Sequence, residues 1–184
     1  MIAAFLSVFL IFFLIGLTIA ILYLLNLQNT VKAAAPENRM MKPGYVWLLI
    51  IPLFNIFYMF YVAKKISATI AAEYAAKGQI PDNPRPTYMV GMSMAVCNFL
   101  NFLIGLYTLP DVWEMYANMG DPEMMEMALQ SSSNVNPLLS GLNSLLGLAG
   151  FILWIAYWIQ THGYKNKMKH LPDANVESQI FGSL

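Results

Sequence analysis

Charged side chains are scarce in this chain of 184 residues, since Asp, Glu, Lys and Arg make up only 11% of the sequence while 58% is hydrophobic. An ordinary soluble domain carries about 25% charged residues. A deficit of this size indicates that most of the protein surface does not face water. The ten basic and ten acidic residues give a formal net charge of zero, so no overall positive charge points to nucleic acid as a partner.

Residues that bind metals or carry out catalysis are also few. Cys97 is the only cysteine, which excludes an intrachain disulfide and a cysteine-based zinc or iron–sulfur site within one chain. The only histidines, His162 and His170, follow the last apolar run, where we expect them in solvent. The thioethers around 124–127 suit Cu(I), but we interpret them as helix-forming apolar contacts. The sequence therefore predicts no catalytic residue, no metal site and no cofactor.

Four long apolar runs predict an all-α integral membrane protein, with one transmembrane helical domain over residues 1–184. The predicted spans cover about 2–26, 45–63, 88–109 and 138–160. At a rise of about 1.5 Å per residue, each run is long enough to cross a hydrocarbon core of about 30 Å. The first run has no basic residue before it and is longer than a signal-peptide core, so we interpret it as a retained span.

None of these four runs contains Asp, Glu, Lys or Arg. Ion-coupled transporters and proton relays usually carry an ionisable residue within the membrane, because that residue binds the ion or transfers the proton. Its absence argues against this class of protein.

The second run contains a polar break. Pro52 removes a backbone donor and predicts a kink, and Asn55 lies close enough to satisfy a group that the kink leaves unpaired. Beyond the run, residues 64–77 keep a helical pattern with one apolar face, so we expect an amphipathic helix along the membrane surface. The residues of that face are Ile66, Ile70 and Tyr74.

Small and amide side chains recur at helical spacing on the third and fourth runs and predict two helix-packing faces. Small residues let backbones approach closely, and amides hydrogen-bond across a helix interface. We therefore expect a membrane-protein partner or a second copy of the chain. The face on the third run comprises Gly91, Ala95, Asn98 and Gly105, with Asn101 beside it, and the face on the fourth comprises Ser140, Ser144 and Gly147.

The two segments outside the predicted spans differ in charge. The loop 110–137 contains five acidic residues and no Lys or Arg. Its Pro110-Asp111 and Asp121-Pro122 pairs predict the starts of two short helices on the membrane surface. The tail 161–184 is basic near its start.

The basic residues favour one orientation in the membrane, because Lys and Arg are enriched in cytoplasmic segments. With four spans, seven Lys or Arg lie on the side of both termini and three on the other side, all within 26–44. We therefore predict both termini in the cytoplasm and the acidic loop outside.

One alternative places all ten Lys and Arg residues on one side of the membrane and none on the other. If 45–62 enters the membrane, turns at Pro52 and returns to the same face, three spans remain and the N-terminus lies outside. We prefer four spans, because the run is long enough to cross and non-helical backbone at membrane depth must be shielded by protein.

Two groups of short motifs carry a resemblance. The first is Leu27-Gln28-Asn29-Thr30, Pro36-Glu37-Asn38-Arg39, Pro43-Gly44-Tyr45-Val46-Trp47 and Ile51-Pro52-Leu53-Phe54-Asn55. The second is Gly147-Leu148-Ala149-Gly150, Trp154, Tyr157-Trp158 and Gly163-Tyr164-Lys165-Asn166-Lys167. Together they resemble small multi-pass bacterial inner-membrane proteins that share a domain of unknown function. The resemblance implies four spans in a bacterial cytoplasmic membrane, makes the acidic loop look like an insertion, and supplies no activity.

These observations favour a non-catalytic multi-pass membrane protein that acts by helix packing with a membrane partner or with itself, as a subunit or assembly factor. The alternative is a small channel or a facilitator for apolar or lipid cargo, with Pro52 and Asn55 as its polar element. A membrane enzyme is the third hypothesis, and Glu37, Asn38 and Arg39 form the only compact polar cluster that it offers.

Overall fold

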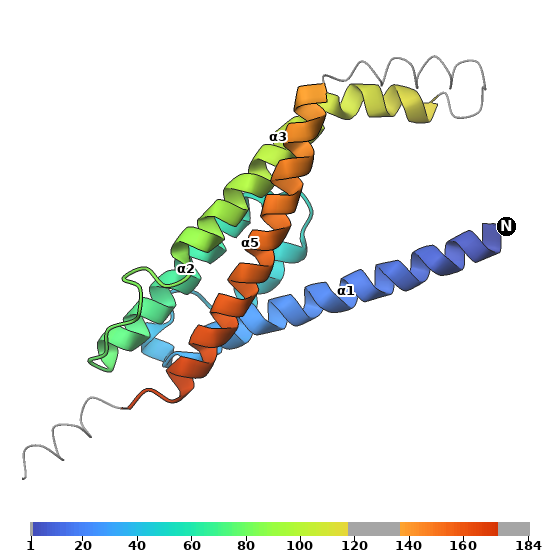
Figure 1. Ribbon diagram of the computed structural model, residues 1–184. Coiled ribbons are helices and arrows are strands. Elements are labelled where there is room, and N and C mark those ends of the chain that lie inside the picture. The colour runs from blue at the N-terminus through green and yellow to red at the C-terminus, as the bar shows by residue number, and fades with distance from the viewer. Residues whose placement is uncertain (1, 118–136, 173–184) are drawn as a thin grey trace, which may run out of the picture.

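The computed structural model describes residues 2–117 and 137–172, and all of the secondary structure in these ranges is helical (Figure 1). The predicted all-α class is confirmed for them. Two short 3₁₀ helices, η1 and η2, lie between the first two long helices. In chain order the elements are α1 (Ile2–Ala33), η1 (Pro36–Asn38), η2 (Pro43–Ile50), α2 (Phe54–Ala76), α3 (Tyr88–Ala117) and α5 (Pro137–Lys169).

Three segments are long and apolar enough to cross a membrane, namely Leu6–Ala33, Tyr88–Leu109 and Leu138–Lys169. They correspond to the first, third and fourth predicted spans. The kinked helical span expected over 45–63 is not found as one helix, because η2 ends at Ile50 and α2 begins only at Phe54. The count of four spans is therefore not confirmed.

The interruption between η2 and α2 is a tight reversal at Pro52. Leu53 has a positive φ of 62°, and the N–H of Phe54 donates to the carbonyl of Pro52 at 2.7 Å, which closes a γ-turn. The N–H groups of Ile51 and Asn55 also find local carbonyl partners, at 3.2 and 3.0 Å, and Pro52 has no N–H to satisfy. A turn of this kind leaves few backbone groups without a partner.

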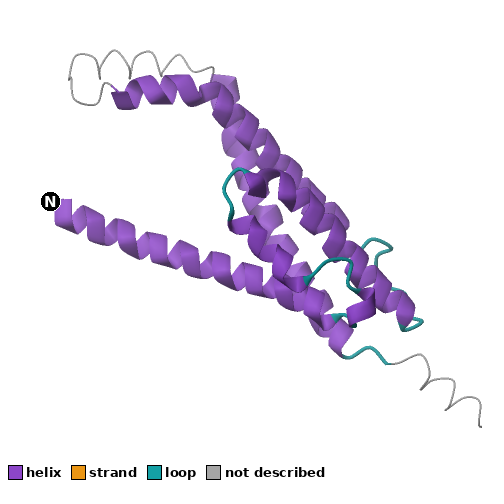
Figure 2. Cartoon of the chain, turned by 180° about the vertical axis from the view of Figure 1, so that it is seen from behind, coloured by secondary structure: helices purple, strands orange, loops and turns teal. Residues whose placement is uncertain are grey.

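The η2 helix packs as the first arm of this hairpin. A 3₁₀ helix brings every third residue to the same face, and Val46 and Leu49 are the buried residues of η2. The indole Nε1 of Trp47 donates to Oε1 of Gln28 on α1 at 3.0 Å. Figure 2 shows the turn as a loop part-way along the bundle, while other loops gather at one end.

The second half of α2 carries the apolar face that the sequence predicts. Ile66 and Ile70 are fully buried and Tyr74 is 6% exposed. They belong to the same core as residues of α1, α3 and α5. The face is therefore covered by protein, whereas the sequence suggested a helix resting on the membrane surface.

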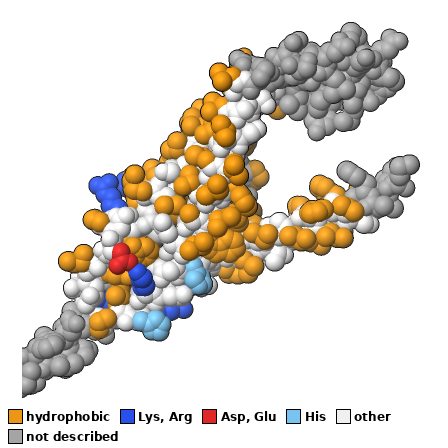
Figure 3. Space-filling view, in the orientation of Figure 1, with side chains coloured by type: hydrophobic (Ala, Val, Ile, Leu, Met, Phe, Trp, Pro, Cys, Tyr) orange, Lys and Arg blue, Asp and Glu red, His pale blue; other side chains and the backbone are white. Residues whose placement is uncertain are grey.

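The buried core and the charged residues lie at the same end of the molecule, which we call the basic end. It comprises the last turns of α1, the loop 34–42, the second half of α2, the start of α3 and the last turns of α5. Figure 3 shows Lys, Arg and His side chains gathered there, with hydrophobic side chains over the rest of the visible described surface. The hydrophobic core consists of Tyr23, Leu24, Leu27, Val31, Met41, Val46, Leu49, Val62, Ile66, Ile70, Tyr74, Met94, Tyr157 and Met168.

The opposite part, which we call the open half, comprises 6–22 of α1, 100–109 of α3 and 138–149 of α5. There α1 leaves the other helices (Figures 1 and 2), and every residue from Leu6 to Leu22 is exposed. The last turns of α3 point away from the axis of its earlier part (Figure 1), as Pro110 within a helix explains. The predicted helix beginning at Pro110 is thus the end of α3, and the one predicted at Asp121 lies outside the described residues.

Candidate helix-packing interface

Gly91 marks the closest approach of α2, α3 and α5. A Cβ added to Gly91 would lie 2.7 Å from Cε2 of Tyr157 and 2.9 Å from Cβ of Ala63. Ala95, one turn further along α3, is fully buried. The first part of the predicted face on α3 therefore packs inside the chain.

Asn98 continues this internal contact. A Cβ on Gly150 of α5 would lie 3.2 Å from Oδ1 of Asn98 and 3.6 Å from Cβ of Cys97. The Nδ2 of Asn98 donates to Sδ of Met59 at 3.4 Å, a weak acceptor. Cys97 is half-buried in the same contact.

The other predicted packing residues face outward. Gly105, Ser140, Ser144 and Gly147 are all exposed, and a Cβ on either glycine would meet nothing within 4 Å. The hydroxyl of Ser144 donates to the carbonyl of Ser140 in its own helix, at 3.0 Å. A side chain added at either glycine would therefore extend into open space, although the backbone N–H of Gly147 lies 3.2 Å from the side-chain oxygen of Asn101 in the orientation described next.

An amide pair lies beside this outward face. With the amide of Asn101 oriented to suit its neighbours, Nδ2 donates to Oδ1 of Asn143 at 2.8 Å and to the Asn143 carbonyl at 3.1 Å. Asn143 is nevertheless exposed. Its spacing from Ser140 and Gly147 places it on the same stripe of α5, so this face presents small and amide groups together.

Asn55 lines an apolar groove of about 350 Å³. Asn55 is half-buried and contributes the only amide among the residues that line the groove. The rest of the lining comes from α1, η2, α2 and α5 and is almost entirely hydrophobic. It consists of Leu17, Ala20, Tyr23, Leu24, Leu49, Ile50, Met59 and Trp154.

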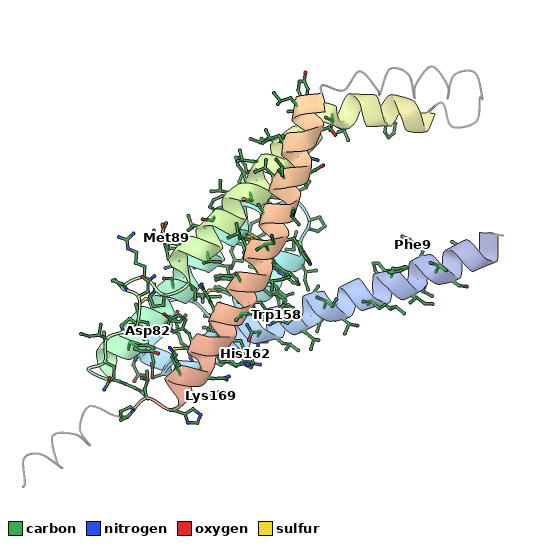
Figure 4. The ribbon with its side chains drawn as sticks, viewed as in Figure 1. Phe9, Asp82, Met89, Trp158, His162 and Lys169 are labelled. Atoms are coloured by element: carbon green, nitrogen blue, oxygen red, sulfur yellow. The ribbon has the colours of Figure 1, made fainter. Side chains whose placement is uncertain are left out.

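A buried polar network, which the sequence reasoning missed, joins α1 to α5 at the basic end. The Nδ2 of Asn26 donates to Oγ1 of Thr161 at 2.8 Å, and Thr30 Oγ1 donates to the Thr161 carbonyl at 3.3 Å. Lys165 Nζ donates to Oδ1 of Asn26 at 3.3 Å, and Nδ1 of His162 lies 3.2 Å from the same oxygen. Figure 4 shows His162 and Trp158 on the side of α5 next to α1. The network fixes the register of the two helices.

Glu73 ties the loop 34–42 to α2. Its side chain is only 2% exposed, and Oε2 accepts from the N–H of Ala35 and from Nδ2 of Asn38, both at 2.8 Å. A second tie joins the N–H of Met40 to Oγ1 of Thr69 at 3.0 Å. Because both partners of the loop lie on α2, the loop and the second half of α2 occupy the same end of the molecule.

Two residues of the polar cluster that the enzyme hypothesis requires, Arg39 and Asn38, make hydrogen bonds within the fold. Arg39 Nε donates to the carbonyl of Ala34 at 2.9 Å, and Nη2 donates to that of Lys32 at 3.1 Å. These carbonyls at the end of α1 have no partner within the helix, so a cation there stabilises it. Asn38 is held by Glu73, and Glu37 is exposed.

No protein-family model, curated protein or solved structure matches the chain.

Proposed function

We propose that the chain crosses the membrane three times, and that η2 and the start of α2 form a re-entrant hairpin. In this arrangement the basic end lies in the cytoplasm and α1 begins outside, unlike the expectation that both termini are cytoplasmic. The bonds from Glu73 and Thr69 to the loop 34–42 support the proposal. With that loop beside α2, all ten Lys and Arg belong to one side, as the positive-inside rule favours.

The function that the geometry supports best is that of a non-catalytic membrane subunit, which packs through its open half against another membrane protein or a second copy. The observation that carries this proposal is the outward stripe on α5, where Asn143 stands exposed between Ser140 and Gly147. Small residues and amides are enriched where membrane helices meet. The oxygens of Asn143 already accept from Asn101, so its side-chain N–H groups are the donors that a partner helix would satisfy in hydrocarbon. The exposed apolar surface of α1 adds area to the same open half.

Substitution of Gly147 by Leu tests this function. A Cβ at Gly147 meets nothing within 4 Å, so the fold should tolerate the larger side chain while a partner helix would be displaced. We expect native mass spectrometry of the chain purified in mild detergent to show a complex for wild type and the chain alone for Gly147→Leu. Gly163→Leu is the matched control, since a Cβ at that exposed glycine of α5 also meets nothing. A complex of unchanged mass in Gly147→Leu would contradict the proposal.

A second candidate, a facilitator for apolar or lipid cargo, is favoured by the groove at Asn55. The groove has the apolar lining and single orienting amide that are typical of small ligand sites. Asn55→Leu removes the amide while keeping the apolar volume. Loss of flux of a fluorescent fatty acid across vesicles containing Asn55→Leu, with the fold intact, would favour this function over the first.

A further inference from the structure

A second pocket, of about 350 Å³, lies at the basic end between α2 and the start of α3. One wall consists of residues from consecutive turns of α2, and the other is the segment that leads into α3. The lining combines two cations, one hydroxyl and small side chains. It consists of Lys64, Ser67, Ala68, Ala71, Pro84, Arg85 and Tyr88.

Each wall of this pocket carries one positive charge. Lys64 and Arg85 contribute two cations, and no acidic residue lies in the lining. The nearby carboxylates are engaged elsewhere, Asp82 with Lys167 and Glu73 with the loop 34–42. In Figure 4 Asp82 lies toward the basic end and Met89 marks the start of α3 above it.

The start of α3 adds to the attraction for an anion. Tyr88, the first residue of this 30-residue helix, lines the pocket. The N–H of Tyr88 donates to the carbonyl of Arg85 at 3.2 Å, so the contribution of this helix N-terminus is the positive end of the helix dipole. The first turn of α3 contains no acidic residue to neutralise that end.

Ser67 adds a hydrogen-bonding group to the pocket. It is only 5% exposed and lines the pocket. Its hydroxyl is not among the fully enclosed polar atoms that lack a partner, which in the described part of the chain are those of Thr87 and Tyr157, and it therefore faces the space of the pocket. A ligand oxygen there can accept a hydrogen bond from it.

We infer that this pocket binds a phosphate group. Lys64 and Arg85 neutralise its charge, and Ser67 donates to one of its oxygens. A membrane lipid is the source that the surroundings favour, because aromatic rings continue the same faces of α2 and α3 toward the hydrocarbon. Phe57, which is 60% exposed, and Phe60 lie with their ring centroids 5.7 and 6.3 Å from that of Phe99.

The test uses the full chain in detergent micelles and native mass spectrometry, with phosphatidylglycerol as the probe and diacylglycerol of the same acyl chains as the phosphate-free comparison. We expect wild type to retain phosphatidylglycerol and to release diacylglycerol. The double variant Lys64→Gln/Arg85→Gln should bind phosphatidylglycerol about tenfold more weakly, because two charge-assisted contacts are lost. Ser67→Ala, which removes one buried oxygen and leaves the fold intact, should weaken binding by about threefold or more.

The control is Lys32→Gln/Lys42→Gln, which removes the same charge from exposed positions of the same end. We expect it to change the affinity by less than about twofold, because neither Lys32 nor Lys42 lines the pocket. Equal loss in the two double variants, or equal retention of diacylglycerol, would overturn the site. Competition by inorganic phosphate distinguishes the sources: displacement of the lipid at millimolar phosphate shows that the pocket accepts a free phosphate, and no displacement shows a site for the lipid headgroup.

Discussion

The basic end and the open half are built from the same helices and use the same kinds of residue, yet only one of them is closed. At the basic end, Gly91 lets Tyr157 approach α3, and Asn26 joins a buried network. In the open half, a Cβ on Gly105 of the same helix would meet nothing within 4 Å, and Asn143 is exposed although it accepts from Asn101. A pattern of small residues or amides therefore predicts that a helix face packs against another helix. It does not predict whether that other helix belongs to the same chain or to a partner.

The largest difference is expected between the two glycines of α3. Gly91→Leu forces a side chain into Tyr157 and Ala63, which are both almost fully buried, and should lower the free energy of unfolding by about 3 kcal/mol or more. Gly105→Leu should leave it unchanged or raise it by up to about 1 kcal/mol, since glycine is a poor helix former. Unfolding of both variants in mixed detergent, followed by circular dichroism, measures the difference. Equal loss in both would remove the distinction between the two regions.

The asparagines give the next largest difference. Asn26→Leu leaves Thr161 and Lys165 without their buried partner and should cost about 2 kcal/mol of unfolding free energy. Asn143→Leu should cost only about 0.6 kcal/mol, a typical value for a hydrogen bond between membrane helices, while reducing the fraction of chain in a complex. The same unfolding assay and native mass spectrometry measure the two effects. An Asn143→Leu variant as unstable as Asn26→Leu would show that the open half depends on contacts within the chain as much as the basic end does.

Glu73 sharpens the comparison within the basic end. Glu73→Ala removes the acceptor for Ala35 and Asn38, and should cost about 1.5 kcal/mol and free the loop 34–42. Hydrogen exchange is expected to become faster in that loop and to stay unchanged in α3. Glu37→Ala, at the exposed carboxylate of the same loop, is the control. Unchanged exchange in Glu73→Ala would show that the loop is held by something else.

The smallest effect is expected at the hairpin turn. Leu53 is 66% exposed and has a positive φ, a conformation that costs an L-residue roughly 1–2 kcal/mol. Leu53→Gly should therefore raise the midpoint of thermal unfolding slightly, although glycine's greater entropy in the unfolded chain offsets part of the gain. Leu53→Val should lower the midpoint, because a β-branched side chain tolerates this conformation least. A lower midpoint for glycine than for valine would contradict the γ-turn.

The sequence predicted the class and three of the helices, because hydropathy and length alone identify a run such as Leu6–Ala33. It also located the apolar face of α2, because the helical spacing of apolar residues is the same whether protein or membrane covers the face. It offered the hairpin only as the alternative to a fourth span, because an apolar run that turns back has the same length and composition as one that crosses. Pro52 and the distribution of basic residues were the signals that pointed to it.

The contacts between distant segments were beyond prediction from one sequence. Asn26 and Thr161 are 135 residues apart, and only the packing of α1 against α5 brings them together. Glu73 reads as one charge on a polar helix face, and nothing local shows that it is buried. Sequence likewise placed Gly91 and Gly105 on one face of α3. In the structure a Cβ on Gly91 would meet Ala63 of α2 and Tyr157 of α5, whereas a Cβ on Gly105 would meet nothing within 4 Å.

The most direct test of the account is the side of the membrane on which the loop 34–42 lies. Glu37→Cys and Ile80→Cys, both at exposed positions, are made separately in a Cys97→Ser background and labelled in inside-out and right-side-out vesicles with a reagent that does not cross the membrane. The hairpin requires that both cysteines are labelled from the same side, the cytoplasmic one. Labelling of position 37 from the side opposite to position 80 would mean that residues 45–62 cross the membrane, and would contradict the single basic end on which the account depends.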